Sequence, residues 1–494
     1  MKLKKAISLC AAISMSLGAV ACGSDSGSGS KTTTAAGGAS TTAAAGSETT
    51  AAGSTAAASS GDKTVINLYA FTDEVPKMVE EFCKRHPDFA AKYEVKTTIK
   101  PTTNQEYQPV LDAALAADGV DMFCAEAAFV KKYTQGDGAK YTAAYEDLGI
   151  SDVAKKISDA EIAQYTVDIG TNKDGKVVGL GYQATGGAFI YRRSIAKDVF
   201  GTDDPGQIKT QVGPGWDKFW EAAAKLKEKN YGIVSGDGDV WHAVENSSSS
   251  GWVNDDGKLV IDPKREEFFD ISKKLKDNGW HNDTRDWTDG WYADMRDQSG
   301  KNEKGEADVK NADTKKIFGY FGPAWLINYT IVKQVGGEKK GEGTYGDWAV
   351  TEPPVGFFWG GTWVLGAKNS KNKEAVGQII EWITLDTSKD GLQYGWANGT
   401  IYGNGGTKDS VASSKVMKES DGKLDMLDGQ NMFDVFVPAN ASANGKTLTQ
   451  YDEDINAIWR DQVRMYTSGQ KSKEEAIKAF KQKVKDDLDI DSAG

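Results

Sequence analysis

The sequence predicts an α/β protein with two lobes. From Thr64 onward, apolar segments of strand length alternate with amphipathic segments of helix length, which is typical of sheets flanked by helices. The chain has 494 residues, and the part beyond its polar N-terminal segment is still longer than one hydrophobic core usually supports. We therefore expect two lobes, each with a sheet and a core of its own.

Three strands and two helices open the folded part of the chain. In order, they are a strand at 65–69, a helix at 74–86, a strand at 93–99, a helix from about 105 and a strand at 120–124. This βαβαβ order predicts a parallel sheet with right-handed crossovers. Such sheets bind ligands beyond the carboxyl ends of their strands. The loops at 70–73 and 125–127 are therefore candidate parts of a binding site.

The same alternation continues towards the C-terminus. The predicted segments are strands within 177–191, a helix at 216–226, strands at 316–321 and 346–350, a helix at 376–383, and two closing helices around 455–459 and 477–484. Four tryptophans fall on the apolar faces of these helices, namely Trp216, Trp220, Trp382 and Trp459. We expect these four rings in the core rather than in a site.

The first residues predict export. Lys2, Lys4 and Lys5 precede the uncharged run 6–21, which is the layout of a secretory signal. This run is shorter than the roughly 20 apolar residues that a transmembrane helix needs, so we expect residues 1–21 to be removed. The run ends in a small-x-small pattern for ordinary cleavage, but Cys22 after a small residue also resembles a bacterial lipobox.

We favour lipidation of Cys22, although Ala19 stands where a lipobox usually has leucine. The segment 22–61 that follows consists almost entirely of Gly, Ser, Thr and Ala. Such a composition cannot bury enough apolar surface to fold, and it predicts a flexible tether with a reach of about 35 Å. A tether of this kind has a purpose if its end is fixed. The sequence thus predicts a protein held to the outer face of the cell membrane by lipid alone.

The net charge of the chain excludes two classes of partner. The net charge of −12 falls to about −15 when the three lysines of the signal are removed, which argues against nucleic acid and against an anionic membrane surface as partners.

Beyond the tether only Cys83 and Cys124 remain. A disulfide is permitted outside the cytoplasm, but both lie among apolar neighbours, so we favour two buried free thiols.

A series of short motifs carries a family resemblance. In order they are Phe71-Thr72-Asp73, His86-Pro87-Asp88, the stretch 113–121, Gly175-Lys176-Val177-Val178-Gly179-Leu180, Tyr191-Arg192, Gly215-Trp216-Asp217-Lys218-Phe219, Gly322-Pro323-Ala324-Trp325, Asp347-Trp348-Ala349-Val350, Trp359-Gly360-Gly361-Thr362-Trp363 and 370–375. Their order resembles that of the family 1 extracellular solute-binding proteins of bacterial carbohydrate ABC transporters, the group that includes maltose-binding protein. The resemblance covers about 64–485. Val120 replaces a proline of the family pattern, and Ala324 is inserted into its Gly-Pro-Trp motif.

The resemblance implies a periplasmic-binding-protein-like fold. Each of two lobes would hold a mixed, mostly parallel sheet flanked by helices, and the ligand cleft would lie at the hinge. The first lobe would contain 62–183 plus 364–405, and the second would contain 184–363 plus 406–494. The protein would close on an oligosaccharide and deliver it to the permease subunits of an ABC transporter. It would act as a monomer without cofactor or metal, and not as an enzyme.

Sugar rings need flat aromatic platforms and polar groups around their rims. The chain has 14 Trp and 18 Tyr, a supply that favours several stacked rings and hence glucose-based oligosaccharides. The aromatic candidates for ligand contact are Trp241, Trp325 and Trp363, followed by Trp359, Trp287, Trp291 and Trp396. We predict that removing the ring of Trp363 weakens binding and leaves the melting curve nearly unchanged.

The polar candidates are Asp73, Glu126, Tyr182 and Gln183. Asp73 and Glu126 follow predicted strands, while Tyr182 and Gln183 lie beside the predicted crossover between lobes. Two alternatives stay open at this point. Asp73 could instead cap the following helix, and Glu126 could be a solvated residue at a helix start.

Two rival functions and a possible calcium site stay open. A glycan-active enzyme would use two carboxylates beside a cleft, but 71 acidic residues produce such pairs by chance and the three histidines are widely separated. A binding lipoprotein for a peptide or polyamine is the second rival. The calcium site would be formed by Asp283, Asp286 and Asp289 or by Asp237 and Asp239. Their spacing does not match an EF-hand loop, and a polar loop is the favoured interpretation.

Overall fold

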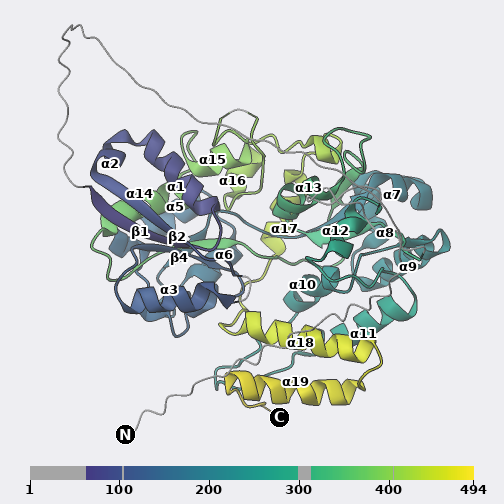
Figure 1. Cartoon of the computed structure of the whole chain (residues 1–494). Coiled ribbons are helices and arrows are strands. Elements are labelled where there is room, and N and C mark those ends of the chain that lie inside the picture. The colour runs from purple at the N-terminus through teal and green to yellow at the C-terminus, as the bar shows by residue number, and fades with distance from the viewer. Residues whose placement is uncertain (1–62, 103–104, 299–312, 404, 494) are drawn as a thin grey trace, which may run out of the picture. The chain divides into compact units, whose positions relative to one another are not determined.

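The computed structural model describes residues 63–102, 105–298, 313–403 and 405–493. Residues 60–494 form one compact unit, shown in Figure 1. The predicted signal 1–21, the lipidation site Cys22 and the tether 22–61 lie outside the described residues. Within the described part, every helix is too short or too polar to cross a bilayer.

The strands of the described residues form three sheets. The strands are β1 (Thr64–Ala70), β2 (Tyr93–Ile99), β3 (Met122–Glu126), β4 (Gly179–Gly181), β5 (Ala188–Arg192), β6 (Tyr231–Gly232), β7 (Lys316–Ile317), β8 (Gly319–Gly322), β9 (Trp348–Thr351) and β10 (Thr362–Gly366). The predicted strands are confirmed with shifts of a few residues, and β2 has the predicted bounds.

Helices surround these sheets (Figure 1). They are α1 (Glu74–Arg85), α2 (Pro87–Lys92), α3 (Tyr107–Ala116), α4 (Val130–Thr134), α5 (Val153–Asp159), α6 (Gln164–Gly170), α7 (Arg193–Phe200), α8 (Pro205–Val212), α9 (Trp216–Glu228), α10 (Gly238–Asn246), α11 (Pro263–Asp277), α12 (Asp289–Met295), α13 (Val332–Gln334), α14 (Lys373–Thr384), α15 (Leu392–Ala397), α16 (Ser414–Lys418), α17 (Phe433–Ser442), α18 (Asp452–Thr467) and α19 (Lys473–Leu488). Short 3-10 turns occur at η2 (Ala139–Tyr141), η3 (Tyr145–Leu148) and η5 (Asp425–Leu427), and η4 (Leu326–Ile331) is a π-helix.

The first sheet has the strand order β2-β1-β3-β10-β4. The pairs β1–β2 and β1–β3 are parallel, as the βαβαβ pattern predicts. Strand β10 was not predicted, because the two glycines before it indicated only a close approach of backbone and ligand. It runs antiparallel to both β3 and β4 in the middle of the sheet. The chain thus returns from far along the sequence to complete this sheet.

Both faces of the first sheet are covered by apolar packing. Along β10 the side chains alternate, since Val364 packs with α1 and α14 on one face while Trp363 and Leu365 pack with α3, α4 and α6 on the other. Every residue of β10 is buried. A strand with both faces covered reads as a continuous apolar run rather than as an alternating one, which explains why its pattern was difficult to recognise.

The second sheet departs from the predicted topology. Its order is β8-β5-β9, and both pairs are antiparallel. Only the small β6–β7 pair nearby is parallel. The expectation of a mostly parallel sheet in each lobe is therefore wrong for this one. The three strands come from distant segments of the chain, so their relative direction depends on the paths between them.

Helices α9, α10, α11, α18 and α19 pack with one face of the second sheet to form a separate core. Figure 1 shows α18 and α19 side by side near the C-terminus. Trp459 and Trp382 are buried, whereas Trp216 and Trp220 are partly buried and stack on one another with ring centroids 5.5 Å apart. All four tryptophans expected in the core pack against apolar clusters.

Cys83 and Cys124 are both free thiols. Cys124 is buried in β3, as expected. Cys83 is only partly buried, because it lies at the margin of the apolar face of α1 that Met78, Val79 and Phe82 occupy. The prediction of two buried thiols is therefore correct for one and wrong for the other.

Candidate functional site

The carboxyl ends of β1, β3 and β4 meet at one edge of the first sheet, where β10 begins. Since β10 is antiparallel to both β3 and β4, those two strands run in the same direction. Glu126 is the last residue of β3 and pairs in register with Thr362. Tyr182 and Gln183 directly follow β4. Three of the four polar candidates thus lie at the edge where an α/β sheet binds ligands.

Glu126 is a partly buried carboxyl group beside other acidic residues. Burial raises its pKa from 4.5 to about 7, although the Ala128 N–H donates to Oε2 at 2.7 Å and opposes the shift. The carboxyl groups of Glu453 and Glu245 also raise the pKa of Glu126. The Glu126 side chain is therefore poised to change its protonation state near neutral pH.

Three tryptophans form an aromatic surface next to Glu126. We call Trp287, Trp325 and Trp359 the tryptophan cluster. The rings of Trp287 and Trp325 are nearly parallel, at 9° with centroids 6.1 Å apart, and the Trp325 and Trp359 centroids are 4.9 Å apart. Trp287 is 45% exposed, and the other two rings are partly buried. Flat, partly exposed rings of this kind can stack on the apolar faces of sugars.

Two glycines place the tryptophan cluster close to Glu126. A β-carbon at Gly360 would lie 3.5 Å from both Glu126 Oε1 and Trp325 Nε1. The Trp325 indole donates to the Trp359 carbonyl at 3.0 Å, and the Ala127 N–H donates to the Gly361 carbonyl at 3.1 Å. Gly360 and Gly361 both have positive φ, at 71° and 112°. Glycine is favoured here because the backbone takes a left-handed conformation while passing between the two groups.

His242 extends the aromatic surface and brings a carboxylate with it. Its ring stacks on Trp359 with centroids 4.5 Å apart and an interplanar angle of 22°. His242 Nδ1 lies 3.5 Å from Glu245 Oε2, one helical turn further along α10. Burial alone would raise the pKa of Glu245, but the hydrogen bond and charge of His242, together with Arg265 and Asn456, outweigh it and lower that pKa. Neither His242 nor Glu245 was among the candidates chosen from sequence, although His242 is one of only three histidines.

A second polar group lies at the same sheet edge. The Tyr182 hydroxyl donates to Glu74 Oε2, and Gln183 hydrogen bonds to the carboxyl group of Asp409. Burial raises the pKa of Asp409 to about 7 and also raises that of Glu74. Tyr182 and Gln183 are themselves buried. They therefore orient the two carboxyl groups, and a ligand would meet Glu74 before it met Tyr182.

The other sequence candidates lie away from the tryptophan cluster. Asp73 is exposed and pairs with Lys77 at 2.5 Å, and its side chain makes no capping bond to α1. Trp241 is buried in α10, where its ring packs on Phe268. Trp363 is fully buried in β10 and donates to the Thr166 carbonyl at 3.0 Å. Ligand contact by these three residues stays a prediction, and their surroundings favour structural roles.

Of the weaker tryptophan candidates Trp287, Trp291 and Trp396, one belongs to the tryptophan cluster and two lie outside it. Trp287 belongs to the tryptophan cluster, whereas Trp291 is buried beneath it and donates to Asp239 Oδ1 at 2.8 Å. Their ring centroids are 5.5 Å apart. Trp396 packs against Tyr182 near the second polar group. Sequence ranked Trp287 among the weaker candidates, because a tryptophan in a loop gives no periodic signal, and the structure places its ring in the tryptophan cluster.

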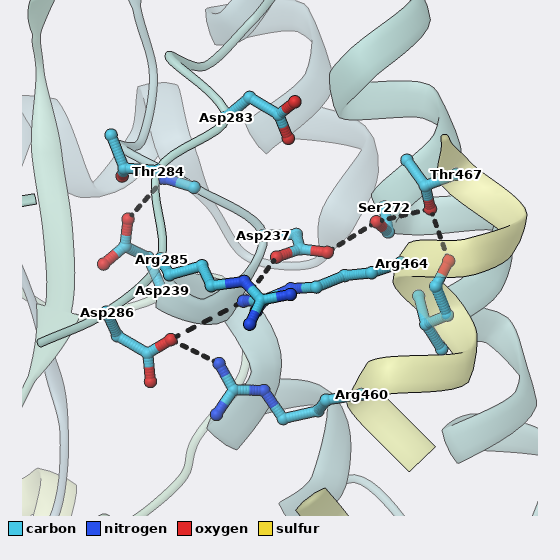
Figure 2. A network of polar contacts seen from close by, with 12 residues as sticks. Asp237, Asp239, Ser272, Asp283, Thr284, Arg285, Asp286, Arg460, Arg464 and Thr467 are labelled. Atoms are coloured by element: carbon cyan, nitrogen blue, oxygen red, sulfur yellow. Dashed lines mark hydrogen bonds and ion pairs between the residues drawn. The ribbon is translucent and has the colours of Figure 1, made fainter. Parts of the chain in front are cut away.

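The acidic loops considered for calcium bind other partners (Figure 2). Asp286 pairs with Arg460, and Asp283 pairs with Lys276 at 2.9 Å. Asp239 accepts from two backbone N–H groups and from Trp291, while Asp237 accepts from Ser272 at 2.6 Å. Among the residues that the structure describes, no three potential metal ligands gather. These interactions favour the polar-loop interpretation.

The arrangement joins aromatic faces to carboxyl groups. The tryptophan cluster offers stacking surfaces, and Glu126, Glu245 and Glu74 offer acceptors for hydroxyl groups. Calcium and zinc sites need several converging ligands at short range, and these carboxyl groups are instead distributed along the sheet edge and α10. Such a combination suits recognition of a neutral, polyhydroxylated ligand.

A model of the family described as bacterial extracellular solute-binding protein matches residues 77–423. A search among curated protein sequences gives no match.

Solved structures share the fold at low sequence identity. An extracellular solute-binding protein of family 1 aligns with a TM-score of 0.66 and 17% identity, over 86% of this chain and 99% of its own. The galacto-N-biose-/lacto-N-biose I-binding protein of Bifidobacterium longum, in complex with lacto-N-biose, aligns with a TM-score of 0.61 and 14% identity, over 88% and 100%. The sugar-binding protein MalE of Xanthomonas citri aligns with a TM-score of 0.61 and 15% identity, over 86% and 97%. At these identities the likeness shows the two-lobe α/β fold alone.

Proposed function

Because the chain belongs to the bacterial extracellular solute-binding proteins, we propose that it captures an oligosaccharide and delivers it to the permease of an ABC transporter. The observation that carries this proposal is the tryptophan cluster beside Glu126, at a sheet edge lined by further carboxyl groups. Stacked rings and acceptors of this kind match the apolar faces and hydroxyl rims of sugars. Proteins of the same fold bind lacto-N-biose, which supports the proposal.

Lobe closure would retain the ligand. The lobe boundaries proposed from sequence are 62–183 plus 364–405 for the first lobe and 184–363 plus 406–494 for the second. The pairing of β10 with β3 and β4 favours starting the return segment of the first lobe at Thr362. Closure would then bring the tryptophan cluster and Glu126 onto the same ligand.

A thermal-shift screen tests this function. The panel contains maltotriose, cellotriose and lacto-N-biose, with a mixed peptide and spermidine to represent other solutes. We expect the melting temperature to rise with at least one sugar and with neither of the other solutes. Incubation with each sugar is followed by chromatography to detect cleavage. Stabilisation by peptide or spermidine would contradict the sugar assignment, and release of sugar products would support the enzyme alternative instead.

Replacement of Glu126 by glutamine should remove a pH dependence of binding. The ionised carboxylate accepts stronger hydrogen bonds from sugar hydroxyls than the neutral acid does. Since its pKa is about 7, we expect affinity to rise by about 3–10-fold between pH 6 and pH 8. Calorimetry across this range should show that rise in the wild type and a flat profile in Glu126→Gln. A parallel rise in both proteins would exclude Glu126 as its source.

The Glu126 carboxyl group should also affect stability, and its contribution to stability should fall with rising pH, whereas its contribution to binding should rise. Burial raises the folded-state pKa of Glu126 above the ordinary 4.5, so the folded protein binds more protons than the unfolded chain between about pH 4.5 and 7. The contribution of Glu126 to stability therefore falls as pH rises through that window. We expect Glu126→Gln to melt at a higher temperature than the wild type at pH 8, and to lose that advantage at pH 4.5.

Cys22 is the proposed membrane anchor. We expect mass spectrometry of the mature protein to find diacylglycerol on Cys22 as the first residue, since a lipid anchor keeps a binding protein at high local concentration near its permease. Cys22→Ala should release the protein into the medium with its sugar affinity intact. An unmodified N-terminus that begins at residue 22 would contradict the anchor and leave the binding function unaffected.

A further inference from the structure

Trp287, the most exposed member of the tryptophan cluster, lies on a strained loop. The loop connects α11 to α12, and Trp287 has a φ of 63°. A bulky residue rarely takes this left-handed conformation, and it persists only where the surroundings determine it. The ring faces Trp325 and Trp359, and it is nevertheless 45% exposed. Packing of the ring alone therefore accounts for only part of what holds the loop in place.

An ion pair holds the residue directly before Trp287. Figure 2 shows Asp286 facing Arg460, which lies on α18 and donates a hydrogen bond to the Asp286 carboxylate. Their side chains are only 11% and 22% exposed, so water screens the pair weakly. Arg464, one turn further along α18, lies 3.9 Å from Asp286 and 3.7 Å from Asp237. Removal of one partner from a buried pair leaves the other charge uncompensated.

A glycine turn makes room for this ion pair. A β-carbon at Gly238 would lie 2.5 Å from Asp286 Oδ1 and 2.7 Å from Arg460 Nη2, and one at Gly236 would lie 2.1 Å from the Thr284 carbonyl. The two glycines thus let the loop approach α10 and α18 closely. Neither glycine position leaves room for a side chain beside the ion pair and the loop.

The same helix also contacts the first lobe. At the start of α18, Glu453 accepts from Gln108 Nε2 at 2.6 Å and Asp454 accepts from Gln105 Nε2 at 2.9 Å. Gln108 lies on α3, which packs against the first sheet. Helix α18 therefore contacts the first lobe through its first turn and, two turns later, contacts the loop between α11 and α12 through Arg460.

We propose that Arg460 is a positioning residue for sugar binding, which holds Trp287 in the tryptophan cluster through Asp286. Because α18 also contacts α3, it links the placement of this ring to contact between the lobes. The inference rests on the proposed function in one respect, namely that Trp287 contacts the sugar. The position of the loop itself does not depend on the identity of the ligand.

A double-mutant cycle tests the proposal. Affinity is measured by calorimetry for wild type, Arg460→Met, Trp287→Ala and the double variant, with whichever of maltotriose, cellotriose or lacto-N-biose stabilises the wild type most. We expect Arg460→Met to weaken binding about 10-fold in the wild type and less than about 2-fold once Trp287 is absent. Equal losses in both backgrounds would overturn the proposal, because a general structural effect would be additive.

Arg285→Met is the matched control. Arg285 is exposed and lies next to Asp286 in the same loop, so its replacement removes the same charge without removing the ion pair. We expect this variant to bind as the wild type does. Asp286→Asn breaks the same ion pair by removing the charge of the other partner. It keeps the proposal testable if Arg460→Met fails to fold. Its loss of affinity should match that of Arg460→Met and should not grow when the two changes are combined.

Hydrogen exchange without ligand provides an independent measurement. We expect amides 284–288 to exchange at least about 10-fold faster in Arg460→Met than in wild type or Arg285→Met. Unchanged exchange would overturn the proposal whatever the ligand is. If none of the sugars binds the wild type, the proposed function fails, while the exchange measurement still decides whether Arg460 holds the loop.

Discussion

Replacement of Trp363 by alanine is expected to destabilise the protein by about 3–5 kcal/mol, which is the usual cost of deleting a buried aromatic ring. The Trp363 side chain is fully buried in the interior strand β10 and packs with α3, α4 and α6. Its indole also donates to the Thr166 carbonyl at 3.0 Å. The truncation would leave a cavity and remove one of the hydrogen bonds that the Thr166 carbonyl accepts.

Denaturant unfolding followed by circular dichroism measures this loss. Trp287→Ala is the matched control, since it removes the same ring from a position that is 45% exposed. We expect that variant to unfold within about 1 kcal/mol of the wild type. This reverses the expectation from sequence, in which loss of the Trp363 ring would leave stability unchanged. A wild-type unfolding curve for Trp363→Ala would show that the ring is not part of the core.

Trp325→Ala should weaken sugar binding by about 10–100-fold, the range typical of a central aromatic contact. The Trp325 ring contacts both other members of the cluster, with centroids 6.1 Å from Trp287 and 4.9 Å from Trp359. Its removal would take away one stacking surface and the support of two others. It would also remove the donor that binds the Trp359 carbonyl at 3.0 Å.

Calorimetry with the most stabilising sugar of the thermal-shift panel measures this effect. Tyr329→Ala is a suitable control, because Tyr329 lies four residues along the chain in η4, is 62% exposed and contacts Lys333 rather than the tryptophan cluster. We expect Tyr329→Ala to bind normally. Equal affinity of Trp325→Ala and the wild type would place the sugar elsewhere.

Strong local patterns were sufficient to predict most of the first lobe. The strand at 93–99 and the helices α1 and α14 combine clear periodicity with short loops, so their limits depend on nearby residues. Strand β10 could not be found in this way. Its residues become a strand only by pairing with β3 and β4, far away in the sequence. The antiparallel direction of the second sheet was missed for the same reason.

At two places a residue chosen from sequence lies next to a side chain that the structure brings to the proposed site. Asp73 was chosen, but its neighbour Glu74 accepts from Tyr182 at the sheet edge. Trp241 was chosen, but its neighbour His242 stacks on Trp359. Successive side chains of a helix point about 100° apart, so the turn that begins the helix decides which of two neighbours faces a site. Sequence showed the turns without showing their geometry, whereas Trp325 and Trp359 were both chosen from sequence and lie together in the structure; their contact with ligand stays a prediction.

The position of β10 between β3 and β4 has a consequence for biosynthesis. The first sheet cannot be completed until the chain reaches Gly366, about 180 residues after the end of β4. At ordinary rates of synthesis, that stretch takes roughly 10–40 s to make. During this interval the edges of β3 and β4 lack the strand that joins them. A chain that we propose is exported would thereby remain incompletely folded while it is being made, and so remain suitable for passage through a narrow translocation channel.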